Sequence, residues 1–105
     1  LKAWMEGVAY ALSPRMKPTV IETIVRRLKV SNPALAEQGY QDLLRATDRK
    51  PYPSVDGLNN VQRLMKLRNP AVADLKAESL IDAKLIQELD QSGFIDQLYS
   101  AYGVK

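Results

Sequence analysis

The chain contains no cysteine and no histidine. Without cysteine it forms no disulfide bond and offers no thiolate ligand, and without histidine it lacks both the commonest metal ligand and the usual general base. Hydrolytic triads that depend on these residues are therefore excluded, and we expect neither an enzyme nor a metal or cofactor site. No segment approaches the roughly 18 consecutive apolar residues that a membrane-spanning helix requires.

The residues that are present give an ordinary globular composition. Of the 105 residues, 46% are hydrophobic and 26% are charged, which is enough to build one hydrophobic core at this length. Fifteen Lys and Arg face twelve Asp and Glu, a net charge of +3. We expect this excess to be scattered with alternating signs, which does not predict a nucleic-acid surface. The sequence predicts a single helical domain or subdomain over residues 1–105.

Apolar residues recur with a period near 3.6, and no segment shows the period of two that a strand requires. The expected fold is all-α, with five or six short helices and no sheet. Asn32 before Pro33 and Ser54 before Val55 are helix-start signals. Residues 71–80 predict at most a short helical turn. The expected helices run from Leu1 to Leu12, Pro18 to about Val30, Pro33 to just before Asp48, Ser54 to Asn69, Asp82 to Ser92, and Ile95 to Tyr102.

The helix that begins at Asp82 has recognisable chemistry at both ends. The Asp82 carboxylate can accept hydrogen bonds from first-turn amides, and the isoleucines at 81 and 86 occupy the positions of a hydrophobic staple. At the other end, Gly93 stands where a left-handed residue closes a helix. Phe94 follows it and is expected to fold back on Leu89, as in a Schellman motif.

The first helix begins without a capping residue, since apolar positions keep helical spacing from Leu1 onward. We therefore expect the chain to be part of a longer protein. Trp4 and Met5 could line a ligand pocket, but we favour core positions or positions covered by the rest of the protein. Together with Val8 they are expected to expose an apolar face on this piece, which two copies would cover as a two-fold dimer.

Two short basic clusters could meet phosphate or an acidic partner. The favoured interpretation is a solvated helix end, where cations complement the helix dipole. The clusters are Arg26, Arg27 and Lys29 in the second helix, and Arg63, Lys66 and Arg68 in the fourth.

The acidic residues near the end of the chain could form a catalytic carboxylate pair or a site for a hard cation. Asp82 is already explained by capping, and Glu88, Asp90 and Asp96 are expected on the polar side of their helices. We expect neither site. The segment from Lys50 to Pro53 resembles a proline-rich recognition peptide, but a rigid connector that pins Tyr52 onto neighbouring helices is the favoured interpretation.

Several short motifs follow one another in an order that is typical of one protein family. They are Tyr52-Pro53 before the helix from Val55 to Met65, then Arg68-Asn69-Pro70, then Ile81-Asp82, and then Ser92-Gly93-Phe94-Ile95. With the first helix and its proline-marked break, they resemble the carboxyl-terminal end of periplasmic solute-binding proteins of ABC importers. The similar group is that of nitrate, sulfonate, taurine and thiamine-precursor transport. The break from Leu12 to Pro18 is longer than is usual in that family.

The resemblance implies a fragment of a two-lobed α/β fold, in which a final run of helices packs on the first lobe. It implies a structural role in a periplasmic protein that delivers a small nutrient to an ABC permease. Sulfonate, nitrate, taurine and pyrimidine-like compounds are the nutrients implied. The family's ligand-binding residues lie before the matching segment, so no ligand-binding residue is assigned here, and this chain alone is not expected to bind the nutrient.

Two other functions stay open at this stage. One is a free-standing helical interaction or regulatory module whose Arg26, Arg27 and Lys29 meet nucleic acid or an acidic partner, with steeply salt-dependent binding. The other is a helical subdomain of an enzyme, such as the thiamine-precursor synthases that share the binding-protein fold. The second would need catalytic groups from outside this chain, because it contains no histidine or cysteine.

Overall fold

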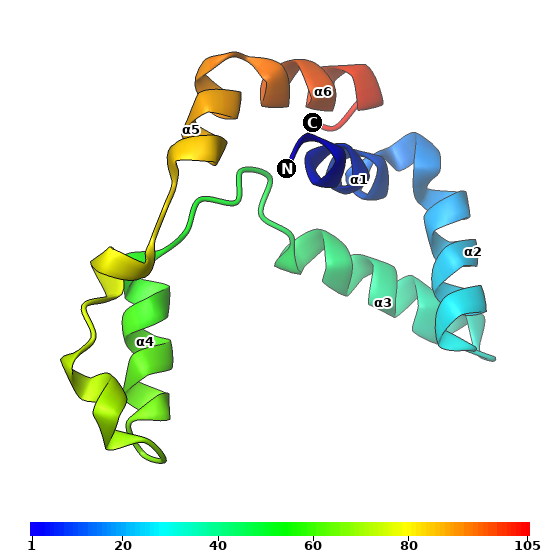
Figure 1. Ribbon diagram of the computed structural model, residues 1–105. Coiled ribbons are helices and arrows are strands. Elements are labelled where there is room, and N and C mark those ends of the chain that lie inside the picture. The colour runs from blue at the N-terminus through cyan, green and yellow to red at the C-terminus, as the bar shows by residue number, and fades with distance from the viewer.

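Six α-helices and three 3₁₀ turns follow one another along residues 1–105 of the computed structural model, and no strand is present (Figure 1). The prediction of an all-α fold with five or six helices is confirmed. The α-helices are α1 (Lys2–Leu12), α2 (Lys17–Leu28), α3 (Pro33–Ala46), α4 (Val55–Met65), α5 (Lys84–Gln91) and α6 (Phe94–Tyr102). The 3₁₀ turns are η1 (Pro14–Met16), η2 (Pro70–Asp74) and η3 (Ala77–Leu80). Residues 71–80, where at most one short helical turn was expected, therefore contribute to two.

The predicted helix starts at α3 and α4 are confirmed in their hydrogen bonds. The Asn32 side-chain oxygen accepts from the Ala34 amide at 2.9 Å, and the Ser54 hydroxyl oxygen accepts from the Gly57 amide at 3.0 Å. Each contact satisfies a backbone donor that has no partner inside its helix.

The ends of α5 match the prediction with two differences. Asp82 Oδ1 accepts from the Lys84 amide at 3.0 Å, but the helix begins at Lys84, two residues later than expected. Gly93 is left-handed, with φ of 77°, as predicted. Of the two Schellman hydrogen bonds, one is present, from the Gly93 amide to the Asp90 carbonyl at 3.0 Å, whereas the Phe94 amide donates to Ser92 Oγ at 3.4 Å and not to the Leu89 carbonyl. Leu89 and Phe94 both pack against the main core.

The main core lies where α1, α5 and α6 meet. Met5 and Ile95 are completely buried there, and the Ser13 hydroxyl donates to the Tyr102 carbonyl at 2.7 Å, which joins the end of α1 to the end of α6. The other buried members of this cluster are Val8, Ala9, Leu12, Ile86 and Tyr99. Apolar burial of this kind is the main stabilising contribution to the packing of these three helices.

A second group of contacts, apart from the main core, joins α2 and α3 into a helical hairpin. Tyr40 and Ala36 of α3 are buried there, as is Val20 of α2. Lys17 Nζ lies 2.7 Å from Glu37 Oε1, and this hydrogen bond lowers the pKa of the Glu37 carboxyl. The hairpin therefore has its own contacts beside the main core.

The third part of the molecule is an arm made of α4, η2 and η3, which stands away from the other helices in Figure 1. The chain as a whole is open: its radius of gyration is 17.5 Å, whereas a compact domain of this length has about 13 Å. Its extents of 47 × 39 × 19 Å describe a flat molecule. No helix is both long and apolar enough to cross a lipid bilayer.

Candidate functional site

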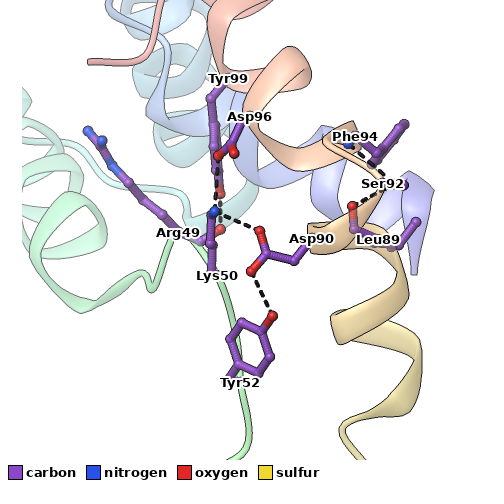
Figure 2. Close-up of polar contacts among 9 residues, drawn as sticks. All are labelled: Arg49, Lys50, Tyr52, Leu89, Asp90, Ser92, Phe94, Asp96 and Tyr99. Atoms are coloured by element: carbon purple, nitrogen blue, oxygen red, sulfur yellow. Dashed lines mark hydrogen bonds and ion pairs between the residues drawn. The ribbon is translucent and has the colours of Figure 1, made fainter.

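The extended linker between α3 and α4 is held by a cluster of polar side chains at the corner of α5 and α6 (Figure 2). Lys50 Nζ lies 2.6 Å from Asp90 Oδ1 and 3.0 Å from Asp96 Oδ1. Asp90 stands near the end of α5 and Asp96 in the first turn of α6. One ammonium group of the linker therefore binds two consecutive helices.

Two tyrosines complete this cluster, which we call the linker clamp: Lys50, Tyr52, Asp90, Asp96 and Tyr99. The Tyr52 hydroxyl donates to Asp90 Oδ2 at 2.6 Å, and the Tyr99 hydroxyl donates to the Arg49 carbonyl. The prediction that the proline-containing connector pins Tyr52 onto neighbouring helices is confirmed. Because the arm follows the linker directly, the clamp sets the point from which the arm projects.

The ionisation of the clamp follows from these contacts. Hydrogen bonds from Lys50, and then from Tyr52, lower the pKa of the Asp90 carboxyl below its usual value. The same carboxylate raises the pKa of Tyr52, and Asp90 and then Asp96 raise the pKa of Lys50. Burial raises the pKa of Tyr99. At neutral pH the clamp consequently holds one cation and two carboxylates that are already paired, which suits attachment better than proton transfer.

The acidic residues that were considered as a catalytic pair or a cation site take other positions. Asp82 accepts a hydrogen bond from the Lys84 amide at the start of α5, although the N-cap residue is Ala83, and Asp90 and Asp96 share Lys50. Glu88 is exposed on α5. No group of three or more acidic side chains lies close enough together to hold a metal ion. Sequence reasoning missed the pairing with Lys50, because nothing in its local sequence indicates a partner so far along the chain.

The prediction for the first helix is partly wrong. Met5 and Val8 are not on an uncovered face, because α6 packs on that side of α1 and buries both side chains. Trp4 does remain 52% exposed. It lies at an open groove of about 530 Å³ between α1 and α3, which we call the Trp4 groove. The lining residues are Ala3, Trp4, Gly7, Val8, Ala11, Leu43 and Thr47.

The arm encloses a second apolar hollow, of about 200 Å³, which we call the arm pocket. Gln62 supports its wall, since its side-chain nitrogen donates at 2.6 Å to the carbonyls of both Val72 and Leu75 and so holds η2 against α4. Seven of the eight lining residues are hydrophobic: Leu58, Val61, Met65, Val72, Leu75, Ala77 and Leu80. The pocket has apolar walls and no ionisable group, so it suits an apolar partner surface.

The basic clusters occupy the two ends of the molecule that lie farthest from α6 in Figure 1. We call residues 26–35, where α2 meets α3, the hairpin tip, and residues 63–68, at the end of α4, the arm tip. The expectation of scattered charge is wrong. No acidic residue occurs in 23–36 or 57–73, and these stretches carry three cations each, so the remaining residues have a net charge of −3.

The six cations of the tips are exposed and form no ion pair. The four ion pairs of the structure are Lys17 with Glu37, Arg45 with Asp42, and Lys50 with both Asp90 and Asp96. Only three of the fifteen Lys and Arg residues take part in these pairs, so the tip cations are six of the twelve that do not: Arg26, Arg27, Lys29, Arg63, Lys66 and Arg68.

Comparison of the chain with protein-family models, curated proteins and solved structures finds no match. The function therefore has to be argued from the open fold, the linker clamp, the two apolar hollows and the basic tips.

Proposed function

We propose that this chain is the structural, carboxyl-terminal helical part of a periplasmic solute-binding protein that delivers a small nutrient to an ABC importer. The nutrient class is that of sulfonate, nitrate, taurine or a pyrimidine-like compound. The order and spacing of the motifs from Tyr52-Pro53 to Ser92-Gly93-Phe94 support the family, and the open fold supports a role in covering another part of the parent protein.

The observation that carries the proposal is the accessible surface of the chain. It is 7800 Å², whereas a compact monomer of 11.8 kDa exposes about 5,900 Å². The difference, about 1,900 Å², exceeds the roughly 800 Å² that each partner contributes to a standard protein interface. Helices with this much additional surface are typical of a segment that packs on a larger body.

The two apolar hollows are the surfaces on which that body would pack. The Trp4 groove and the arm pocket are both open, and large apolar residues beside them stay exposed, including Trp4, Val61 and Leu75. The linker clamp fixes the linker that separates the two hollows, so that a lobe can contact both at a defined spacing. The clamp is thus a positioning device in this proposal.

The proposal assigns no catalytic step and no ligand contact to this chain. Ligand capture and transfer to the permease belong to the lobes of the parent protein, outside the cytoplasm. The role here is to brace the first lobe and to keep its outer helices in place. This division follows from the family resemblance, in which the ligand loops precede the helical run.

A second candidate is a free-standing helical module that binds an acidic partner or nucleic acid, and the unpaired cations of the two tips favour it. It accounts for the charge of the tips. It gives no reason for the Trp4 groove or the arm pocket, whose linings are largely apolar. The solute-binding proposal accounts for these surfaces and is preferred.

The gene that encodes the chain gives the first test. The coding sequence upstream of Leu1 should contain a leader and alternating strands and helices, and the parent protein should bind one of the four nutrient classes in calorimetry. The 105-residue chain should give no heat with the same compounds. A saturable signal from this chain alone would contradict the proposal, as would a gene whose upstream region encodes no α/β lobes.

A further inference from the structure

We infer that the hairpin tip and the arm tip together bind the surface of an anionic lipid bilayer. This goes beyond the proposed function, because it concerns the outer edge of the chain and does not depend on which nutrient the parent protein carries. It rests on three observations: the separation of charge, the exposed leucines beside the cations, and the position of both tips along one side of the molecule.

The positive charge of the tips favours binding to an anionic partner. Each tip carries three exposed Lys or Arg side chains that have no carboxylate partner, and the rest of the chain has a net charge of −3. An anionic surface would attract the tips and repel the rest of the molecule, which gives it one orientation. Each basic residue near such a surface contributes a modest attraction that salt screens.

The apolar residues of the tips favour lipid over nucleic acid. Leu28 is 71% exposed beside Arg26 and Arg27, and Leu67 is 82% exposed between Lys66 and Arg68. Leu35, Leu64 and Met65 are also exposed. A nucleic-acid phosphate backbone has no apolar surface that a leucine side chain could contact. The acid-free stretches 23–36 and 57–73 also contain no aromatic residue on which a base could stack. A bilayer interface takes up both side-chain types, since leucine enters the acyl boundary while cations meet the headgroups.

The placement of the tips suits a flat target. Both lie on the side of the molecule opposite α6, at the lower corners of Figure 1, and they end two separate prongs. The molecule is only 19 Å thick. A planar surface can meet two such prongs at once, and simultaneous contact strengthens binding through effective concentration. The linker clamp holds the arm prong in position.

Flotation of the 105-residue chain with lipid vesicles tests this inference. We expect the chain to float with vesicles that contain phosphatidylglycerol and to stay unbound with pure phosphatidylcholine. Substitution of Arg26, Arg27 and Lys29 by Gln should lower the partition coefficient at least about tenfold, and the same change at Arg63, Lys66 and Arg68 should do likewise. A matched control removes three other cations, Arg45→Gln, Lys84→Gln and Lys105→Gln, and should change partition far less.

A variant that lacks the exposed leucines distinguishes lipid binding from general attraction to polyanions. The double variant Leu28→Ser and Leu67→Ser keeps all six cations and should lower the partition coefficient about fivefold or more. Both residues are exposed, so folding should be unaffected, which circular dichroism checks. Equal partition of the tip and control variants would overturn the inference. So would a leucine variant that partitions normally, or duplex DNA that binds the chain as tightly as the vesicles do. None of these three outcomes would contradict the proposed role in a solute-binding protein.

Discussion

The Tyr52 hydroxyl donates a 2.6 Å hydrogen bond to Asp90 Oδ2 across 38 positions of sequence. The other oxygen of the same carboxylate, Oδ1, lies 2.6 Å from Lys50 Nζ. A proline-flanked linker that has no regular structure of its own is thereby fixed to the end of α5 (Figure 2). The position of the arm depends on this contact, because the main core contains none of the arm's residues.

Asp90→Asn should release the linker while leaving the core intact. The amide cannot pair with the Lys50 ammonium as a carboxylate does, so hydrogen exchange should become markedly faster at the Tyr52 amide, which donates to the Lys50 carbonyl at 2.8 Å. Global stability should change little, because the contacts are at the surface. Glu88→Gln is the matched control, since Glu88 is an exposed acid on the same helix. Unchanged exchange at the Tyr52 amide in Asp90→Asn would show that the clamp does not hold the linker.

The linker clamp should also weaken in acid. The Asp90 pKa is lowered in the folded protein, so its contribution to stability is fully present above the unfolded value of about 3.9. That contribution disappears as the pH falls through the lower folded value. Carbon-13 titration of the Asp90 carboxyl, followed together with linker exchange, should show both changes at the same pH. An Asp90 midpoint at or above the usual aspartate range would contradict this prediction.

Gly93→Ala should destabilise the protein by about 1 kcal/mol. The φ of 77° is unfavourable for a residue with a side chain, whereas the nearest atom to an added Cβ is 3.8 Å away, so the cost comes from the backbone. Gly7→Ala is the control, because Gly7 lies inside α1 with open space around it and should gain about 0.5–1 kcal/mol. Urea denaturation gives both values. Destabilisation of equal size at the two positions would mean that backbone conformation is not the cause.

The 105-residue chain should associate when it is free in solution. Its Trp4 groove and arm pocket are open, and exposed apolar surface of this extent is unusual in a monomer. Light scattering over a concentration series should show a mass that rises toward a dimer, the commonest closed assembly. Trp4→Ser with Leu75→Ser should shift the midpoint to higher concentration. A monomer mass at every concentration would contradict the prediction.

The local features of the fold could be predicted from the sequence because their causes are local. Asn32 and Ser54 start helices through side chains that reach amides two or three residues away. Gly93 closes α5 because few residues tolerate its backbone conformation. These signals involve neighbours in the chain, so a sequence pattern contains both partners of each contact.

The arrangement of the helices could not be predicted in the same way. No local pattern indicates that Lys50 reaches Asp90 and Asp96, since each of these residues alone is typical of a solvated surface. The apolar stripe of α1 showed that Met5 and Val8 prefer burial, but it did not show that α6 would cover them. The acid-free stretches at 23–36 and 57–73 were visible as residues, yet only the fold places both at the same side of the molecule.

The most direct test of the central claim is reconstitution of this chain with the rest of the proposed parent protein. The chain has a single tryptophan, so 5-fluorotryptophan reports on Trp4 alone when the unlabelled polypeptide encoded upstream of Leu1 is added. We predict a one-to-one complex in which the fluorine resonance shifts and loses its sensitivity to solvent deuterium, because a lobe covers the Trp4 groove. A resonance that stays unchanged and solvent-sensitive at saturating upstream polypeptide would contradict the account.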